Sequence, residues 1–145
     1  MRNAKDPPRL SVAETADLLP TIFAPWITEM GLQPVAVHDN GADFRLEDNR
    51  RLVHAGGVIC GQATASAADT ASILTLAAHN GRFRMVTTVS FTCQFICALP
   101  PGELDIAVTI EANGKRMAYL RVDIRAAGSE KPAVGFVGSF MYLGD

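Results

Sequence analysis

The segment from His54 to Gly81 constrains the fold of this 145-residue chain more than any other. It opens with glycines at positions 56, 57 and 61 and then contains no further Gly or Pro until Asn80-Gly81. This pattern predicts a glycine-rich loop that leads into a long helix, which an Asn-Gly pair ends. The first half of the helix is almost entirely small side chains, with Asp69 as its one charge. A helix of this composition is expected to be buried against an element that approaches it closely.

The composition places the chain among globular proteins, because 48% of its residues are hydrophobic and 19% are charged. We expect a flexible arm over residues 1–10, where Pro7-Pro8 lies, and one domain over 11–145. The net charge of −2 and the absence of a basic stripe argue against nucleic acid as a partner.

The sequence contains no signal-type segment and no apolar run of about 20 residues, so we expect neither secretion nor a membrane partner. Three cysteines are an odd number without a Cys-X-X-Cys pair. They predict free thiols in a cytoplasmic protein.

The first half of the chain predicts two helical pieces and a hairpin. Ser11 and Glu14 form a capping box for a helix that should end at Leu19, before Pro20. A second piece is expected to bury an apolar stripe in the core, made of Ile22, Phe23, Trp26, Ile27 and Met30. Strands are expected over 34–39 and 42–47, joined at Asp39-Asn40-Gly41.

After Gly81 the apolar pattern changes to period two, which predicts strands. In the strand over 85–97 the odd-numbered residues form the apolar face, with Thr87 among them. Three more strands are expected over 104–110, 118–125 and 133–143, and short turns should make all four antiparallel neighbours. The fold class is therefore α+β, with a long central helix wrapped by a curved antiparallel sheet of about five to six strands.

Four segments together resemble the hotdog-fold acyl-CoA thioesterases of the phenylacetate-pathway (PaaI-like) type. They are GGVICGQATASAAD at 56–69, VTTVSFTCQFICALPPGEL at 86–104, NGKR at 113–116 and GFVGSFMYL at 135–143. The resemblance implies a thioester hydrolase that acts on acyl-CoA. It implies no cofactor and no metal, because coenzyme A is part of the substrate.

Asp69 is the candidate catalytic residue, because Gly61 to Asp69 has the spacing between the key glycine and the catalytic acid in that family. As nucleophile, its carboxylate attacks the thioester carbonyl; as base, it activates a water for that attack. The alternative is a structural Asp that bonds a neighbouring strand.

The resemblance places the oxyanion-binding amide at Gly61 or Gln62. Amides at a helix N-terminus are unpaired and carry partial positive charge. Asp69 lies about 12 Å further along the helix axis, too far for both groups of one chain to contact one carbonyl. Either these roles are wrong or a second protomer supplies one of the groups. The resemblance implies the second option, with sites shared between subunits, and we expect a homodimer, with a homotetramer also open.

Other site residues are assigned by the resemblance. His54 is a candidate for orienting the carbonyl or the water, and Thr87 for holding the water or the acid; a surface histidine and an ordinary strand threonine are the alternatives. Gly57, Cys60 and Thr88 are assigned to substrate binding. Cys60 stands where many relatives have His, which leaves a cysteine nucleophile as a further alternative.

Six basic residues are candidates for the phosphates of coenzyme A, although solvated surface charge is the better explanation for most of them: Arg50, Arg51, Arg82, Arg84, Lys115 and Arg116. Two rival functions remain open from the sequence. One is a hotdog hydratase or dehydratase, which would need a His near Asp69 on the central helix. The other is an acyl-CoA-binding module without turnover.

Overall fold

A computed structural model describes residues 6–144 as two short helices, a six-stranded sheet and one long helix. The elements follow in the order α1 (Val12–Ile22), α2 (Pro25–Thr28), β1 (Leu32–His38), β2 (Gly41–Leu46), the 3-10 turn η1 (Arg50–Leu52), α3 (Gly61–Asn80), β3 (Val86–Phe95), β4 (Leu104–Asn113), β5 (Met117–Ala126) and β6 (Val134–Tyr142).

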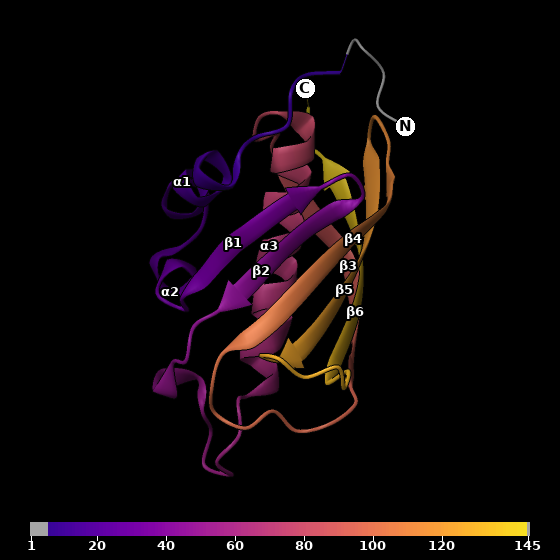
Figure 1. Cartoon of the computed structure of the whole chain (residues 1–145). Helices are drawn as coiled ribbons and strands as arrows, with labels where there is room; N and C mark the ends of the chain where they lie inside the picture. Colours follow the sequence, from indigo (N-terminus) through magenta and orange to yellow (C-terminus); the bar gives the residue numbers. More distant parts are fainter. Residues whose placement is uncertain (1–5, 145) are drawn as a thin grey trace.

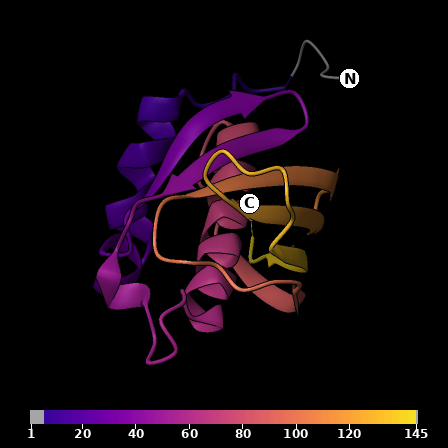
Figure 2. The same cartoon turned by 60° about the horizontal axis from the view of Figure 1, so that its bottom comes forward.

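The sheet curls around α3, as the sequence predicted. All strand pairs are antiparallel, in the order β1-β2-β4-β5-β6-β3. Figure 1 shows α3 running along the concave side of the sheet, and Figure 2 shows the strands enclosing the helix from β1 round to β3. The helix α3 contacts all six strands as well as α1 and α2, so the sheet and both N-terminal helices are positioned relative to it.

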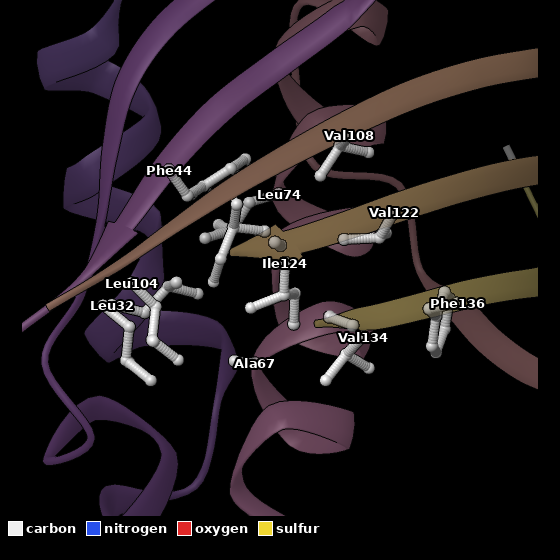
Figure 3. Packing of buried hydrophobic residues seen from close by; sticks show 14 of the residues in the cluster. Leu32, Phe44, Ala67, Leu74, Leu104, Val108, Val122, Ile124, Val134 and Phe136 are labelled. Atoms are coloured by element: carbon white, nitrogen blue, oxygen red, sulfur yellow. The ribbon is translucent and has the colours of Figure 1, made fainter. Parts of the chain in front are cut away.

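The core forms where α3 meets the concave face. Ala67, Ala71 and Leu74 of the helix are fully buried, and large side chains of the strands fill the space around them, as Figure 3 shows for Phe44 and Ile124. Alanines let the strands approach the helix backbone, and the larger strand residues then complete a close-packed interior.

The buried face of α3 also carries hydroxyl groups. Thr70, Ser72 and Thr75 donate to the carbonyl oxygens four residues earlier, at 2.8, 2.8 and 2.7 Å. These bonds satisfy the hydroxyls inside the helix itself. No buried side-chain polar atom in the described range 6–144 lacks a partner.

The prediction that the last four strands are neighbours in sequence order is wrong for β3. This strand pairs with β6 and lies at the sheet edge, while β4 pairs with β2 and β5. Residues 96–103 are too long for a tight hairpin, which typically has two to five residues. They cross to the far strands instead, with Leu99 buried and its carbonyl accepting from Ile59 N–H at 2.9 Å.

The N-terminal helices differ from the prediction in two respects. The helix α1 continues through Pro20 to Ile22, and Pro25 begins α2 rather than interrupting a helix. Proline is well suited to the first position of a helix, where its missing N–H has no partner to lose. Trp26 is 60% exposed, so it does not belong to the core as predicted, whereas Ile27 and Met30 do.

The described part of the expected flexible arm, residues 6–10, is held against the end of α3. Leu10 N–H donates to Ala78 O at 2.9 Å, and Arg9 pairs with Asp39 at 3.0 Å. Pro7 and Pro8 contact Gly81, which ends α3 in the left-handed conformation that the Asn-Gly signal predicted. The first five residues of that arm lie outside the described range.

Gly41 offers a test of the packing between the β1–β2 hairpin and β4. A Cβ at this position would lie 1.8 Å from the backbone oxygen of Val108, so Gly41→Ala must displace one strand from the other. We expect a loss of at least about 1–3 kcal/mol in the free energy of unfolding, measured by urea denaturation. Gly135→Ala in β6 is the control, because its Cβ meets no atom within 4 Å. Equal stability of the two variants would contradict this packing.

Candidate active site

Asp69 lies in the middle of α3 with its side chain half-buried, facing the edge strand β3. The hydroxyl of Thr88 donates to its Oδ1 at 2.7 Å. Burial raises the pKa of the Asp69 carboxyl above its ordinary value, and the Thr88 hydrogen bond opposes this shift by a smaller amount. The carboxylate is thus partly desolvated, and the Thr88 hydroxyl fixes its orientation.

The hydroxyl against Asp69 belongs to Thr88 because β3 contains a bulge. The strand pairs Thr88 with Phe140 and Ser90 with Ser139, which leaves Val89 as an extra residue. Thr88 therefore shares the inner face with the buried Phe140, and Thr87 shares the outer face with Met141. The prediction that Thr87 lies on the core face is wrong, because one inserted residue exchanges the two faces of a strand.

Beyond the bulge, the odd-numbered residues of β3 face inward as predicted. Phe91 stacks on the buried Phe136 with ring centres 5.2 Å apart. Burial raises the pKa of the Cys93 thiol, and the negative charge of Asp69 raises it further. The inner side of β3 beyond the bulge is therefore largely apolar, on the strand that Asp69 contacts through Thr88.

The start of α3 presents unpaired backbone amides. Cys60 is the N-cap and forms no side-chain cap, and the N–H groups of Ala63 and Thr64 bond to its carbonyl. Within residues 6–144, no hydrogen bond uses the N–H of Gly61 or Gln62. Such amides combine partial positive charge with free donors, which suits an oxygen that becomes negative.

Phe95 lies against the helix start. The sequence places it only on the apolar face of its strand, as one of the odd-numbered residues of 85–97. A Cβ at Gly61 would come within 3.0 Å of the Phe95 ring, so only glycine allows this approach without a shift of the ring. The ring itself is 58% exposed. Glycine at the key position of the motif is the one signal that pointed to a close neighbour here.

His54 belongs to the tight loop before α3. Its Nδ1 accepts from Gly56 N–H at 2.8 Å, and its carbonyl accepts from Gly57 N–H at 2.9 Å. When the ring is neutral, Nε2 therefore carries the proton and is the donor of the ring. The loop is exposed, and Gly57 adopts the left-handed conformation that its turn requires.

The basic candidates divide between the two ends of α3. Arg50 and Arg51 belong to η1 near the helix start, and Arg51 pairs with Glu29 at 3.6 Å. At the far end, Arg84 lies over the Tyr142 ring at 3.7 Å and donates to Lys115 O, which is a structural role. The remaining members of the set, Arg82 and Arg116, also lie at that end.

The site residues predicted from the sequence thus form two groups within one chain. Asp69 and Thr88 form the first, and the second comprises Gly61, Gln62, Cys60 and the loop that carries His54 and Gly57. The helical rise separates the two groups by about 12 Å, as predicted.

Among residues 6–144, no three His, Cys, Asp or Glu side chains are placed to hold a metal ion, and no helix is long and apolar enough to span a membrane.

Comparison with known proteins decides the family. The family model described as "Thioesterase superfamily" matches residues 56–133, more than half of the chain and all of the segment from α3 through β5. This chain belongs to the thioesterase superfamily. A comparison with curated protein sequences finds no match.

Solved structures agree with this membership in their fold, which is the hotdog fold. A conserved protein of Pseudomonas aeruginosa is 25% identical, with 86% of this chain and 98% of that chain covered and a TM-score of 0.75. A thioesterase of Haemophilus influenzae is 13% identical, with 93% and 92% covered and a TM-score of 0.80. The phenylacetic acid degradation protein PaaI of Thermus thermophilus, in a mutant form, is 19% identical, with 83% and 100% covered and a TM-score of 0.71.

Thr88→Val tests the environment of Asp69 in this thioesterase fold. Loss of the donor to Oδ1 removes the interaction that lowers the pKa of the carboxyl, so we expect that pKa to rise further. Titration of the Asp69 carboxyl carbon by NMR measures it. Thr87→Val is the control, since Thr87 lies on the outer face. Equal titration curves for the two variants would contradict the contact.

Proposed function

We propose that this protein hydrolyses acyl-CoA thioesters to a free acid and coenzyme A, at sites shared between two protomers. Membership of the thioesterase superfamily supports thioester hydrolysis. The observation that carries the finer proposal is the oriented, half-buried Asp69 carboxylate on the same helix that begins with two free amides. The PaaI-like type and a cytoplasmic location belong to this proposal, and three unpaired cysteines are compatible with the latter.

The proposed chemistry uses side-chain and backbone groups of the protein together with water. Asp69 either attacks the thioester carbon directly or takes a proton from a water that attacks it. The carbonyl oxygen becomes negative and is held by the amides of Gly61 and Gln62. The carbon–sulfur bond then breaks, and the coenzyme A thiolate leaves and takes up a proton. In the direct route, water afterwards hydrolyses the acyl–Asp69 anhydride.

The edge strand β3 supports a shared site. It has ten residues, pairs only with β6 among the strands of the described residues, and exposes large apolar side chains such as Val89, Phe91 and Phe95. A long apolar edge is a template for pairing with another strand, and a second copy of β3 would complete it. Such pairing would bring Asp69 of one protomer, which faces β3, toward the helix start of its partner. A homodimer is the smallest assembly in which two copies of β3 can pair, and a homotetramer would contain the same pair.

Asp69→Asn tests the catalytic proposal directly. The amide keeps the shape and the acceptor for Thr88 but cannot act as base or nucleophile, so we expect kcat to fall by about 10²–10⁴. The assay is hydrolysis of a panel of short, medium and aromatic acyl-CoAs. Asp17→Asn on the exposed face of α1 is the control. Unchanged rates in Asp69→Asn would refute the mechanism, and binding by the wild type without turnover would favour a sensor.

Mixed dimers test whether the site crosses two chains. Gln62→Pro removes one amide donor in the first helical turn, where proline is tolerated. Co-expressed with Asp69→Asn chains, it should restore about a quarter of wild-type activity, because half of randomly assorted dimers are mixed and each has one complete site. Tagged subunits allow the mixed dimers to be isolated and assayed. Activity that stays at the level of the separate variants would place the whole site within one chain.

A further inference from the structure

A pocket of about 280 Å³ lies between α2, η1 and the first turns of α3. Its wall is mostly apolar and includes Trp26, Met30, Leu52 and Ala63. This volume is close to the lower end of small-molecule sites, about 300–1,000 Å³, so it suits one substituent rather than a whole coenzyme.

Trp26 is the prominent residue of this pocket. Its side chain is 60% exposed, although the neighbouring Ile27 and the nearby Met30 are buried. It is also the one tryptophan of the chain. A large aromatic residue left exposed on the wall of an apolar pocket indicates a surface that contacts a ligand.

Hydrogen bonds of Asn49 hold part of the pocket wall in place. The amide of Asn49 donates to the carbonyls of Glu29 and Met30, at 3.2 and 3.3 Å, and its oxygen accepts from Arg51 N–H at 3.1 Å. Asn49 therefore ties η1 to the end of α2. The pocket is formed before a ligand arrives, which reduces the ordering that binding requires.

The pocket adjoins the proposed reaction centre. Gln62 lines it, and the backbone N–H of Gln62, which no hydrogen bond within residues 6–144 uses, is one of the two proposed oxyanion donors. A second pocket, with Phe95 on its wall, lies on roughly the opposite side of the helix start, next to the β3 edge. That second pocket would be altered by a partner at β3, whereas the Trp26 pocket is built from elements away from that edge.

We propose that the Trp26 pocket receives the acyl group of the thioester and that Trp26 determines which acyl groups are accepted. This inference rests on the proposed function and specifies its substrate class. The carbonyl oxygen binds at the amides of Gly61 and Gln62, the apolar acyl group extends along Ala63 toward Trp26, and the polar coenzyme A extends away from the pocket. The occupant is an aryl group or a short to medium alkyl group.

Rates for a series from acetyl-CoA to decanoyl-CoA, with phenylacetyl-CoA, test the assignment. In Trp26→Ala we expect kcat/KM for the best wild-type substrate to fall about 10-fold or more and the preference to move to longer chains. Acetyl-CoA, which barely enters the pocket, should change by less than about 3-fold. Trp26→Phe should retain most of the wild-type preference.

Two matched variants sharpen this test. Tyr119→Ala removes an aromatic of similar exposure (48%) from the outer face of the sheet and should leave the series unchanged. Phe95→Ala opens the second pocket. A uniform effect of Trp26→Ala across all chain lengths, or a shift of preference in Phe95→Ala instead, would overturn the proposal.

Fluorescence of Trp26 provides a readout that needs no turnover. Non-hydrolysable S-alkyl-CoA thioethers should change its emission in a saturable way, with affinity rising with alkyl length, while coenzyme A alone should not. No change with any thioether would overturn the pocket assignment even if the enzyme is active. A saturable change in a protein that hydrolyses no acyl-CoA would support the pocket and refute the proposed function.

Discussion

Close packing of one small-sided helix against a curved sheet is the interaction on which the rest of this structure depends. Alanines of α3 allow the strands of the curved sheet to approach the helix backbone closely. Strand side chains of ordinary size then fill the interior. Larger residues on the helix would push the sheet outward and open voids that destabilise the core. The less buried face of α3 carries short side chains such as Ala65 and Ser66 before Asp69, which is itself only half-buried.

Placing an acid in this helix has a consequence for both stability and reactivity. Burial raises the pKa of Asp69, which means that the charged form is less favourable in the folded chain than in water. A group of this kind weakens the fold at neutral pH, and such groups are found where chemistry needs them. Thr88 offsets part of the penalty and holds the carboxylate in one orientation.

In the proposed homodimer, the helix start of one protomer and the edge strand β3 would complete the site around Asp69 of the other. The free amides lie at one end of α3, and β3 offers an unpaired apolar edge beside the acid. A second protomer at that edge, as proposed, would cover the apolar side chains and bring its amides toward the acid. The Trp26 pocket lies on the other side of the helix start and remains open in that arrangement.

The sequence by itself determined the central helix, its Asn-Gly end, the capping box of α1 and most strands, because these depend on local patterns of period, glycine and proline. Its four motif segments, by their resemblance to a known family, also indicated the hotdog fold, and the spacing from Gly61 to Asp69 can be counted directly. Only the tertiary structure decided the rest. The pairing of β3 with β6, the bulge at Val89 that turns Thr88 rather than Thr87 toward Asp69, and the exposure of Trp26 all depend on which distant segments meet. Alternation along a strand cannot reveal one inserted residue, because a bulge is defined by the partner strand against which it forms.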